Sequence, residues 1–327
     1  MGRELVDLFG RVHRDFRISV TDRCNFRCQY CMPEEGLDWL KREELLTFEE
    51  ITRLTKILVE NYGIHSVRLT GGEPTLRANL SDLISMLSEL PIEIALTTNG
   101  ITLEKNAHIL RSAGLNRINI SIDSLKAEKF KEITLRDEMQ KVITGIEASL
   151  EAGLSPVKIN VVTMRGINDD EILDFAKFGR DLSVIVRFIE FMPLDADENW
   201  STAAVISQEE IFSTINSVYP LEAVERSSAP ASRFRYLDGQ GEIGIVASVT
   251  QKFCGTCDRI RITADGQFRN CLFSNEELDL KEALRSGSSD REICELLESA
   301  VLAKREGHGI GNVDFIRPAR SMSQIGG

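Results

Sequence analysis

The sequence predicts an α/β fold, a partial (β/α)6 barrel of the TIM type followed by a smaller C-terminal domain. Three observations predict it. Six short β-branched runs alternate with helical patterns, successive runs carry polar residues on one face, and this rhythm stops after about residue 195. We therefore expect an open barrel over residues 1–220 and a second domain over residues 221–327.

The six runs predicted as parallel strands are residues 16–21, 66–70, 92–98, 117–123, 157–163 and 184–190. The clearest helix lies between the first two runs. Thr47 and Glu50 form a capping box at its start, and Gly63 ends it. Further helical patterns cover residues 104–115, 140–154 and 169–179, each ending in or near a glycine.

The polar face of the runs favours a partial barrel over other sheets. In the second run, for example, Val67 and Leu69 alternate with Arg68 and Thr70. A sheet covered by helices on both faces would read as almost continuously apolar. A closed eight-stranded barrel would fill its interior with branched apolar residues. We therefore expect an open barrel whose polar interior is the binding site; an antiparallel sheet with one wet face fits the alternation but not the helices.

Composition excludes several classes of protein. The 327 residues are 42% hydrophobic and 28% charged, as in globular proteins, and no run approaches the ~20 apolar residues of a membrane span. The net charge of −12 disfavours nucleic-acid binding. The N-terminal segment is too charged for a signal peptide, so we expect a cytoplasmic protein, no membrane partner and reduced cysteines.

Three cysteines lie close together in the loop after the first predicted strand. Cys24, Cys28 and Cys31 have the spacing C-x3-C-x2-C. A structural zinc site takes four protein ligands, usually as two pairs. A four-iron cluster held by three thiolates instead leaves one iron open for a cofactor, at the strand end where barrel active sites are built. Zinc remains the alternative.

A second triplet, Cys254, Cys257 and Cys271, lies in the C-terminal part. The seventh cysteine, Cys294, falls in a helical pattern among apolar residues, which favours a buried, inert role. If Cys294 were a ligand, the site would close and become structural zinc. Arg259 and Arg261 alternate on a predicted strand, and two parallel guanidinium groups suit a phosphate or a purine edge. A solvated edge strand is the alternative.

The first triplet, with Tyr30 before its last cysteine and the motif Gly71-Gly72-Glu73-Pro74, resembles the radical S-adenosylmethionine (SAM) superfamily. Two triplets together resemble the GTP 3′,8-cyclases, the family that opens molybdenum cofactor biosynthesis. Supporting stretches are "FRISVTDRCNFRCQYCMP", "VRLTGGEPTLR", "TTNG", "INISIDSL", "RFIEFMP", "CGTCDRIRIT" and the C-terminal "GG". The resemblance covers nearly the whole chain.

The resemblance implies a role for each matching residue. The first [4Fe–4S] cluster would be held by Cys24, Cys28 and Cys31, and the second by Cys254, Cys257 and Cys271. The SAM site would be formed by Tyr30, Gly72, Ser121 and Met192, and the GTP site by Arg17, Arg68, Thr97, Lys158, Arg259, Ile260 and Arg261. The tail that reaches the active site would be Gly326 and Gly327. Arg17 also counts among the catalytic group. For the tail, a disordered terminus or the activated end of a sulfur carrier are the alternatives.

The resemblance also implies the reaction and the partners. A 5′-deoxyadenosyl radical from SAM abstracts the ribose C3′ hydrogen of GTP, and C3′ attacks guanine C8, which makes the enzyme a lyase. The expected partners are an electron donor, cyclic pyranopterin monophosphate synthase as product acceptor, and a second copy in a homodimer. A radical SAM peptide-maturing enzyme and a zinc-stabilised nucleic-acid module are the alternatives; the former carries more cysteines, and the acidic charge disfavours the latter.

Overall fold

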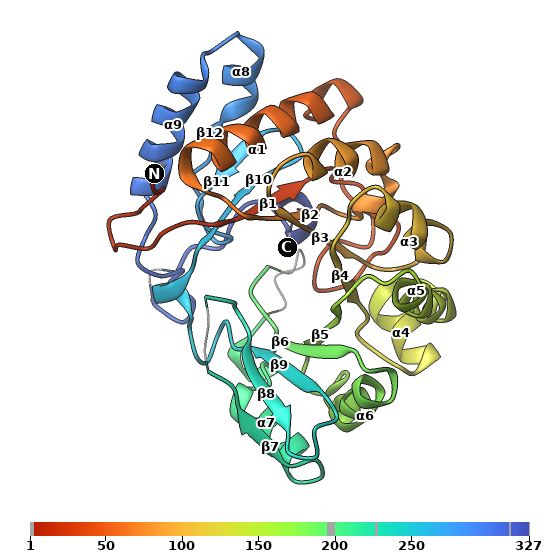
Figure 1. The fold of residues 1–327 in the computed structure, drawn as a ribbon. Coiled ribbons are helices and arrows are strands. Elements are labelled where there is room, and N and C mark those ends of the chain that lie inside the picture. Colours follow the sequence, from red (N-terminus) through yellow and green to blue (C-terminus); the bar gives the residue numbers. More distant parts are fainter. Residues whose placement is uncertain (1–2, 195–199, 226–227, 314, 327) are drawn as a thin grey trace.

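The computed structural model describes residues 3–194, 200–225, 228–313 and 315–326. Their strands form a single sheet in the order β12-β11-β10-β1-β2-β3-β4-β5-β6-β9-β8-β7, which does not close. Figure 1 shows the sheet curving, with the helices that connect its strands along the outside. The predicted α/β class and open parallel sheet are confirmed.

The six predicted strands form the centre of the sheet. They are β1 (Asp15–Ser19), β2 (Ser66–Thr70), β3 (Glu93–Thr98), β4 (Arg117–Ser121), β5 (Val157–Thr163) and β6 (Ile185–Glu190), all parallel. The helices of this part are α1 (Phe48–Tyr62), α2 (Leu80–Ser88), α3 (Leu103–Ser112), α4 (Ala127–Thr134), α5 (Met139–Glu151), α6 (Ile172–Leu182) and α7 (Gln208–Asn216).

Helix α1 begins and ends as its sequence predicts. The Thr47 hydroxyl accepts a hydrogen bond from the Glu50 N–H at 3.2 Å, and the Glu50 carboxylate accepts one from the Thr47 N–H at 2.8 Å. Gly63 follows the helix in the left-handed conformation, with φ of 67°. The capping box and the glycine stop therefore both form.

The C-terminal part joins the same sheet at both sides of the central strands. Its elements are β7 (Leu221–Ala223), β8 (Ser232–Tyr236), β9 (Glu242–Val246), β10 (Arg259–Ile262), β11 (Gln267–Arg269), β12 (Leu278–Asp279), α8 (Leu280–Arg285), α9 (Asp290–Leu302) and α10 (Met322–Ile325). Strand β10 pairs in parallel with β1, and β9 pairs in parallel with β6. The division of the chain at residue 220 stays a prediction; its two sides share one sheet.

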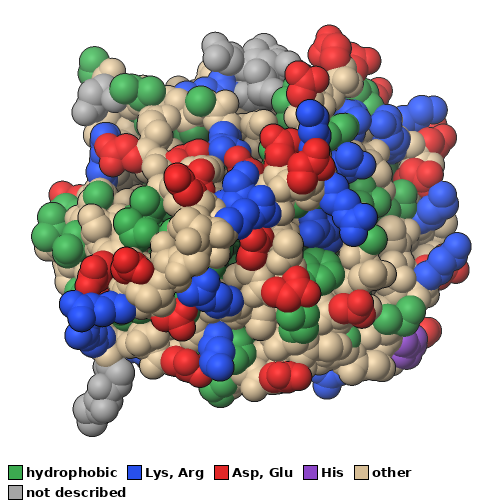
Figure 2. All heavy atoms as spheres, turned by 90° about the horizontal axis from the view of Figure 1, so that it is seen from above, with side chains coloured by type: hydrophobic (Ala, Val, Ile, Leu, Met, Phe, Trp, Pro, Cys, Tyr) green, Lys and Arg blue, Asp and Glu red, His purple; other side chains and the backbone are tan. Residues whose placement is uncertain are grey.

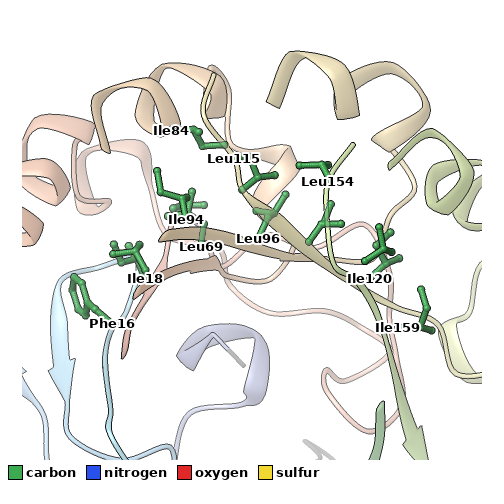
Figure 3. Close-up of a cluster of buried hydrophobic side chains, with 14 of the residues drawn as sticks. Phe16, Ile18, Leu69, Ile84, Ile94, Leu96, Leu115, Ile120, Leu154 and Ile159 are labelled. Atoms are coloured by element: carbon green, nitrogen blue, oxygen red, sulfur yellow. The ribbon is translucent and has the colours of Figure 1, made fainter. Parts of the chain in front are cut away.

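The outer face of the strands forms the main hydrophobic core. Ile18, Leu69 and Leu96 are fully buried and lie side by side in register across β1, β2 and β3. Figure 3 shows these side chains on the same side of the sheet as Ile84 and Leu115, which come from the layer of helices and loops above it. Burying apolar area stabilises the fold by about 25 cal/mol per Å², so this face anchors the barrel.

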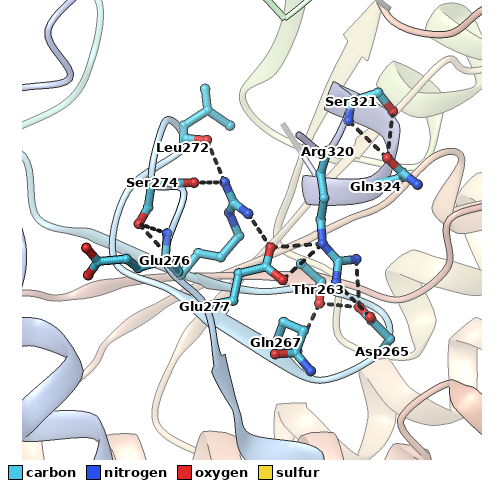
Figure 4. Close-up of polar contacts among 11 residues, drawn as sticks. Thr263, Asp265, Gln267, Leu272, Ser274, Glu276, Glu277, Arg320, Ser321 and Gln324 are labelled. Carbon is cyan, nitrogen blue, oxygen red and sulfur yellow. Dashed lines mark hydrogen bonds and ion pairs between the residues drawn. The ribbon is translucent and has the colours of Figure 1, made fainter. Parts of the chain in front are cut away.

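The last described segment is tied to the second half of the sheet by charged contacts. The Arg320 guanidinium donates to both oxygens of Asp265, at 3.1 and 2.9 Å, and forms an ion pair with Glu277 at 2.8 Å (Figure 4). Helix α10 follows directly, within the curve of the sheet (Figure 1). These contacts direct the end of the chain toward the inner face of the barrel.

The surface of the molecule mixes charges of both signs. Acidic and basic side chains are interspersed over the face in Figure 2. No helix in the described part of the chain is long and apolar enough to cross a membrane.

Candidate active site

The first cysteine triplet lies in the loop after β1, at the carboxyl end of the parallel strands. Cys24, Cys28 and Cys31 are partly exposed free thiols, and the Cys31 N–H donates to the Cys28 carbonyl at 2.9 Å. Burial raises the pKa of Cys24 to about 11 and that of Cys31 to about 12, and it raises the pKa of Cys28 well above its usual value. The raised pKa values favour the protonated thiols, and the positive charge of bound iron would stabilise the thiolates.

The glycine motif after β2 packs against the backbone of the cysteine loop. The Gly72 N–H donates to the Thr21 carbonyl at 2.8 Å, and a Cβ at Gly72 would lie 2.4 Å from the carbonyl oxygens of Asp22 and Arg23. No side chain fits there. Glu73 is buried, and its carboxylate accepts hydrogen bonds at 2.6–3.0 Å from the N–H and hydroxyl of Thr75, the hydroxyl of Thr98 and the N–H of Asn99.

Tyr30 links the cysteine loop to the end of β4. Its hydroxyl donates to Asp123 at 2.7 Å, and the other Asp123 oxygen accepts from the Val162 N–H at 2.8 Å. Burial raises the pKa of Asp123 to about 6. The remaining predicted SAM residues lie on the same edge: Ser121 ends β4, and the half-buried Met192 follows β6. The four predicted SAM residues therefore come from the carboxyl ends of β1, β2, β4 and β6, and their contacts with SAM stay a prediction.

A row of arginines crosses the inner face of the sheet. Arg17 lies in register between Arg261 on one side and Arg68 on the other, and the same line continues through Ala95 to Arg117. Arg68 and Arg261 are nearly inaccessible to water, with 7% and 4% exposed. Six buried guanidinium nitrogens have no hydrogen-bond acceptor among the described residues, those of Arg17, Arg68, Arg117, Arg259, Arg261 and, in register with Arg261 on β11, Arg269.

Burial and mutual repulsion lower the pKa values of the basic groups on the inner face. Burial, followed by Arg187 and Arg117, lowers the pKa of Lys158 to about 8. Burial, followed by Arg17, lowers the pKa values of Arg187 and Arg261 to about 9. Buried like charges with unused donors are a site that a polyanion would complete.

The other predicted GTP residues divide between the two faces. Thr97 lies on the inner face, where its hydroxyl accepts from the Asn119 side chain at 3.2 Å. Ile260 is fully buried in the hydrophobic core and lies in register with Phe16, so its side chain belongs to the outer face. Only the backbone of Ile260 is left to contact a ligand.

The second cysteine triplet flanks the far end of the arginine row. Cys254 and Cys257 belong to the turn before β10, and Cys271 follows β11. Burial raises the pKa of Cys254. Burial also acts to raise the pKa of Cys257, but Arg259 and Lys304 outweigh it and lower that pKa to about 7. Cys294 lies apart from both triplets, in the core beside Tyr62, whose hydroxyl donates to its carbonyl at 3.3 Å.

Both triplets fit the iron–sulfur groups that the sequence predicts. The thiols of each triplet are free and interact electrostatically with one another. No three His, Cys, Asp or Glu side chains of the described residues are arranged to hold a single metal ion. Thiolate triplets are the donors that such clusters use.

The tail reaches the inner face near the first triplet. A Cβ at Gly326 would lie 2.4 Å from the Thr70 hydroxyl oxygen and 3.0 Å from the Ser19 Cβ. A hydrogen bond from the backbone of Ser323 to Cys31 lowers the pKa of that thiol, against the effect of burial. The predicted role of Gly327 falls on a residue outside the described ones.

Several inner-face residues were missed by the sequence prediction. Arg187 on β6 donates to the Asn160 side chain at 3.0 Å through Nε and at 2.5 Å through Nη2. Arg117 belongs to the arginine row. Both could have been found, because Arg117 shares the parity of Asn119 in its strand and Arg187 alternates with Val186 and Phe188.

Comparisons with known proteins find matches over nearly the whole chain. The family model of the Radical SAM superfamily matches residues 18–179, and that of Molybdenum Cofactor Synthesis C matches residues 184–310. The GTP 3′,8-cyclase of Streptomyces coelicolor is 46% identical over 328 residues, covering 99% of this chain and 96% of its own. That of Rhodopirellula baltica is 44% identical over 330 residues, covering 99% and 92%.

Solved structures share the fold. Native anSMEcpe with bound AdoMet matches with a TM-score of 0.59 at 14% identity, covering 94% of this chain and 93% of that one. Streptococcus suis SuiB bound to S-adenosylmethionine matches with a TM-score of 0.64 at 14% identity, covering 90% and 69%. At these identities the likeness shows the open α/β architecture and nothing more.

Proposed function

We propose the function of this chain from its membership of the GTP 3′,8-cyclase family, within the radical SAM superfamily. It is an enzyme that converts GTP to (8S)-3′,8-cyclo-7,8-dihydroguanosine 5′-triphosphate, the first step of molybdenum cofactor biosynthesis. The reaction removes the ribose C3′ hydrogen and joins C3′ to guanine C8. The main support for the proposal is the row of arginines on the inner face, whose buried guanidinium nitrogens have no hydrogen-bond acceptor among the described residues.

Two [4Fe–4S] clusters and SAM serve as cofactors in this proposal. Cys24, Cys28 and Cys31 hold the cluster that binds SAM, and the loops of Tyr30 and Gly72 line the SAM site. When bound, these groups supply the 5′-deoxyadenosyl radical that takes the hydrogen atom. The second triplet holds the auxiliary cluster beside the guanine.

The chain's own contribution is to bind and orient GTP. Arg17, Arg68 and Arg261 present unused N–H donors on one line, which suits successive phosphate groups. Binding a triphosphate satisfies these donors and offsets the burial and the repulsion between arginines that together lower their pKa values. This local cation site explains how a protein of net charge −12 takes an anionic substrate.

Burial of the inner face also protects the chemistry. Asn119 is 1% exposed and Arg68 7% exposed, so the floor of the site has little access to bulk water. A dry site holds C3′ in one orientation and keeps water from the reacting carbon.

The alternative functions explain fewer features of the site. A nucleic-acid module would present its arginines to solvent, whereas Arg259 and Arg261 are buried on the inner face. We further propose an external electron donor, transfer of product to cyclic pyranopterin monophosphate synthase, a homodimer, and a cytoplasmic location where the thiols stay reduced.

The test is turnover by protein purified and reconstituted without oxygen. We expect about eight irons per chain, from two four-iron clusters. With SAM, a reductant and GTP, the protein should release 5′-deoxyadenosine as it consumes GTP. ATP in place of GTP is the matched control, because it keeps the triphosphate and changes the base. Zinc without iron, or equal consumption of ATP, would refute the proposal.

A further inference from the structure

Lys304 is a buried lysine in direct contact with the second cysteine triplet. It follows α9, and only 3% of its surface is exposed. Its Nζ lies 2.8 Å from His13 Nε2 and 2.9 Å from the Arg259 carbonyl. The Cys257 sulfur lies 3.6 Å away and the Cys257 carbonyl 3.5 Å away. A charged group is almost never buried this completely without a specific partner.

The neighbours of Lys304 determine where its hydrogens point. His13 Nδ1 lies 3.2 Å from the Leu5 carbonyl, which only accepts, so Nδ1 carries the hydrogen of the neutral ring. Burial and then Lys304 lower the pKa of His13 to about 4, which keeps the ring neutral. His13 Nε2 therefore accepts from Lys304. An ammonium has three donors; His13 and the Arg259 carbonyl take two, and the third faces Cys257.

A rigid polar support holds this lysine in place. The Arg11 guanidinium donates to the carbonyls of Cys254, Arg305 and Glu306 at 2.7–2.9 Å, and its Nε donates to Asp7 at 2.6 Å. Arg11 thus joins the N-terminal segment, the cysteine turn and the chain just after Lys304. The hydrogen bonds of Arg11 are buried or partly buried, and they fix three chain segments around the contact between Lys304 and Cys257.

We propose that Lys304 is a positioning residue of the auxiliary iron–sulfur site, donating an N–H to the Cys257 sulfur and making the bound cluster easier to reduce. The inference rests on the proposed function, which assigns a cluster to this triplet. A donor to a ligating sulfur withdraws electron density from the iron and stabilises the reduced state. The competing role is purely structural, a lysine that binds the Arg259 carbonyl near a helix end.

The test measures the reduction potential of the auxiliary cluster alone. The full-length chain carries Cys24→Ala, Cys28→Ala and Cys31→Ala, so that only the second triplet binds iron, about four per chain. Lys304→Met is added, and the potential is followed by electron paramagnetic resonance. We expect a shift to more negative potential equivalent to about tenfold in the reduction equilibrium, or ~59 mV for one electron. The matched control is Lys252→Met, which removes an exposed lysine two residues before Cys254 and should leave the potential unchanged.

Each other outcome has a defined meaning. An unchanged potential in Lys304→Met at full iron content overturns the inference. If Lys304→Met loses iron, Lys304→Gln retains an N–H donor without the charge and should load iron with a smaller negative shift. Loss of iron in both variants overturns the tuning role in favour of the structural one. A background chain that binds no iron at all refutes the proposed function instead.

Discussion

The two faces of the central strands contribute to the molecule in opposite ways. On the outer face, Ile18, Leu69 and Leu96 are buried against apolar neighbours and stabilise the fold. On the inner face, Arg17 and Arg68 lie on the same strands, and their buried nitrogens lack acceptors among the described residues. Burying such groups without partners costs free energy. The outer face therefore builds the barrel, and the inner face is available to bind a ligand.

The largest effect should follow a change on the outer face. Leu96→Ala removes a fully buried side chain from the core and should lower the free energy of unfolding by about 3 kcal/mol. Denaturant titration of the anaerobic protein measures it. GTP affinity of the folded variant should stay within about twofold, because Leu96 faces away from the arginine row. A loss of affinity as large as that of the next variant would contradict the division between the faces.

A change on the inner face should have the reverse effect. Arg17→Ala removes the central guanidinium of the row and should weaken GTP binding by about 2 kcal/mol, roughly 30-fold, with both clusters still assembled. Its unfolding free energy should change less than that of Leu96→Ala, because the substitution removes both the repulsion from Arg259 and the attraction to the Asp15 carboxylate, which lies 3.9 Å from Arg17. Calorimetric titration with GTP measures the affinity. Arg53→Ala, which removes an exposed ion pair to Asp290, is the control and should bind GTP normally.

The sequence predicted which residues share a face of the sheet, but it did not predict how far the sheet extends. Alternation within each strand placed Arg17, Arg68 and Lys158 on one face, because side-chain direction is a local property of a strand. The addition of β9 and β10 to the sheet is a pairing between distant segments, which no local pattern determines. His13 and Lys304 are 291 positions apart, so their contact was likewise beyond sequence reasoning.

A smaller effect should appear as a dependence on pH. Burial, with the neighbouring arginines, lowers the pKa of Lys158 to about 8, so the free enzyme loses this positive charge as the pH rises through 8. Since GTP binds the protonated form, its affinity should fall by up to roughly eightfold between about pH 7.5 and 9. Lys158→Met should bind more weakly and lose most of this dependence.

The same lysine gives a stability prediction of known sign. Its pKa in the folded chain lies below that of an unfolded lysine, so folding is penalised while the group is protonated. The penalty is present below about pH 8 and is relieved as the pH rises toward 10. The ligand-free protein should therefore gain stability over that range relative to Lys158→Met. An identical pH profile for both proteins would show that Lys158 is not strained by the inner face.

The smallest effect concerns the tail, and two glycines allow it to be separated from backbone strain. Gly326 and Gly311 have φ of 82° and 84°, so alanine at either position should cost about 1 kcal/mol of local strain. Only Gly326 meets the inner face; nothing lies within 4 Å of a Cβ at Gly311. Gly326→Ala should therefore lower the turnover of GTP several-fold, and Gly311→Ala should not. Equal turnover in the two variants would mean that the tail rests against Ser19 and Thr70 without serving the reaction, and the inner face would then end at its arginines.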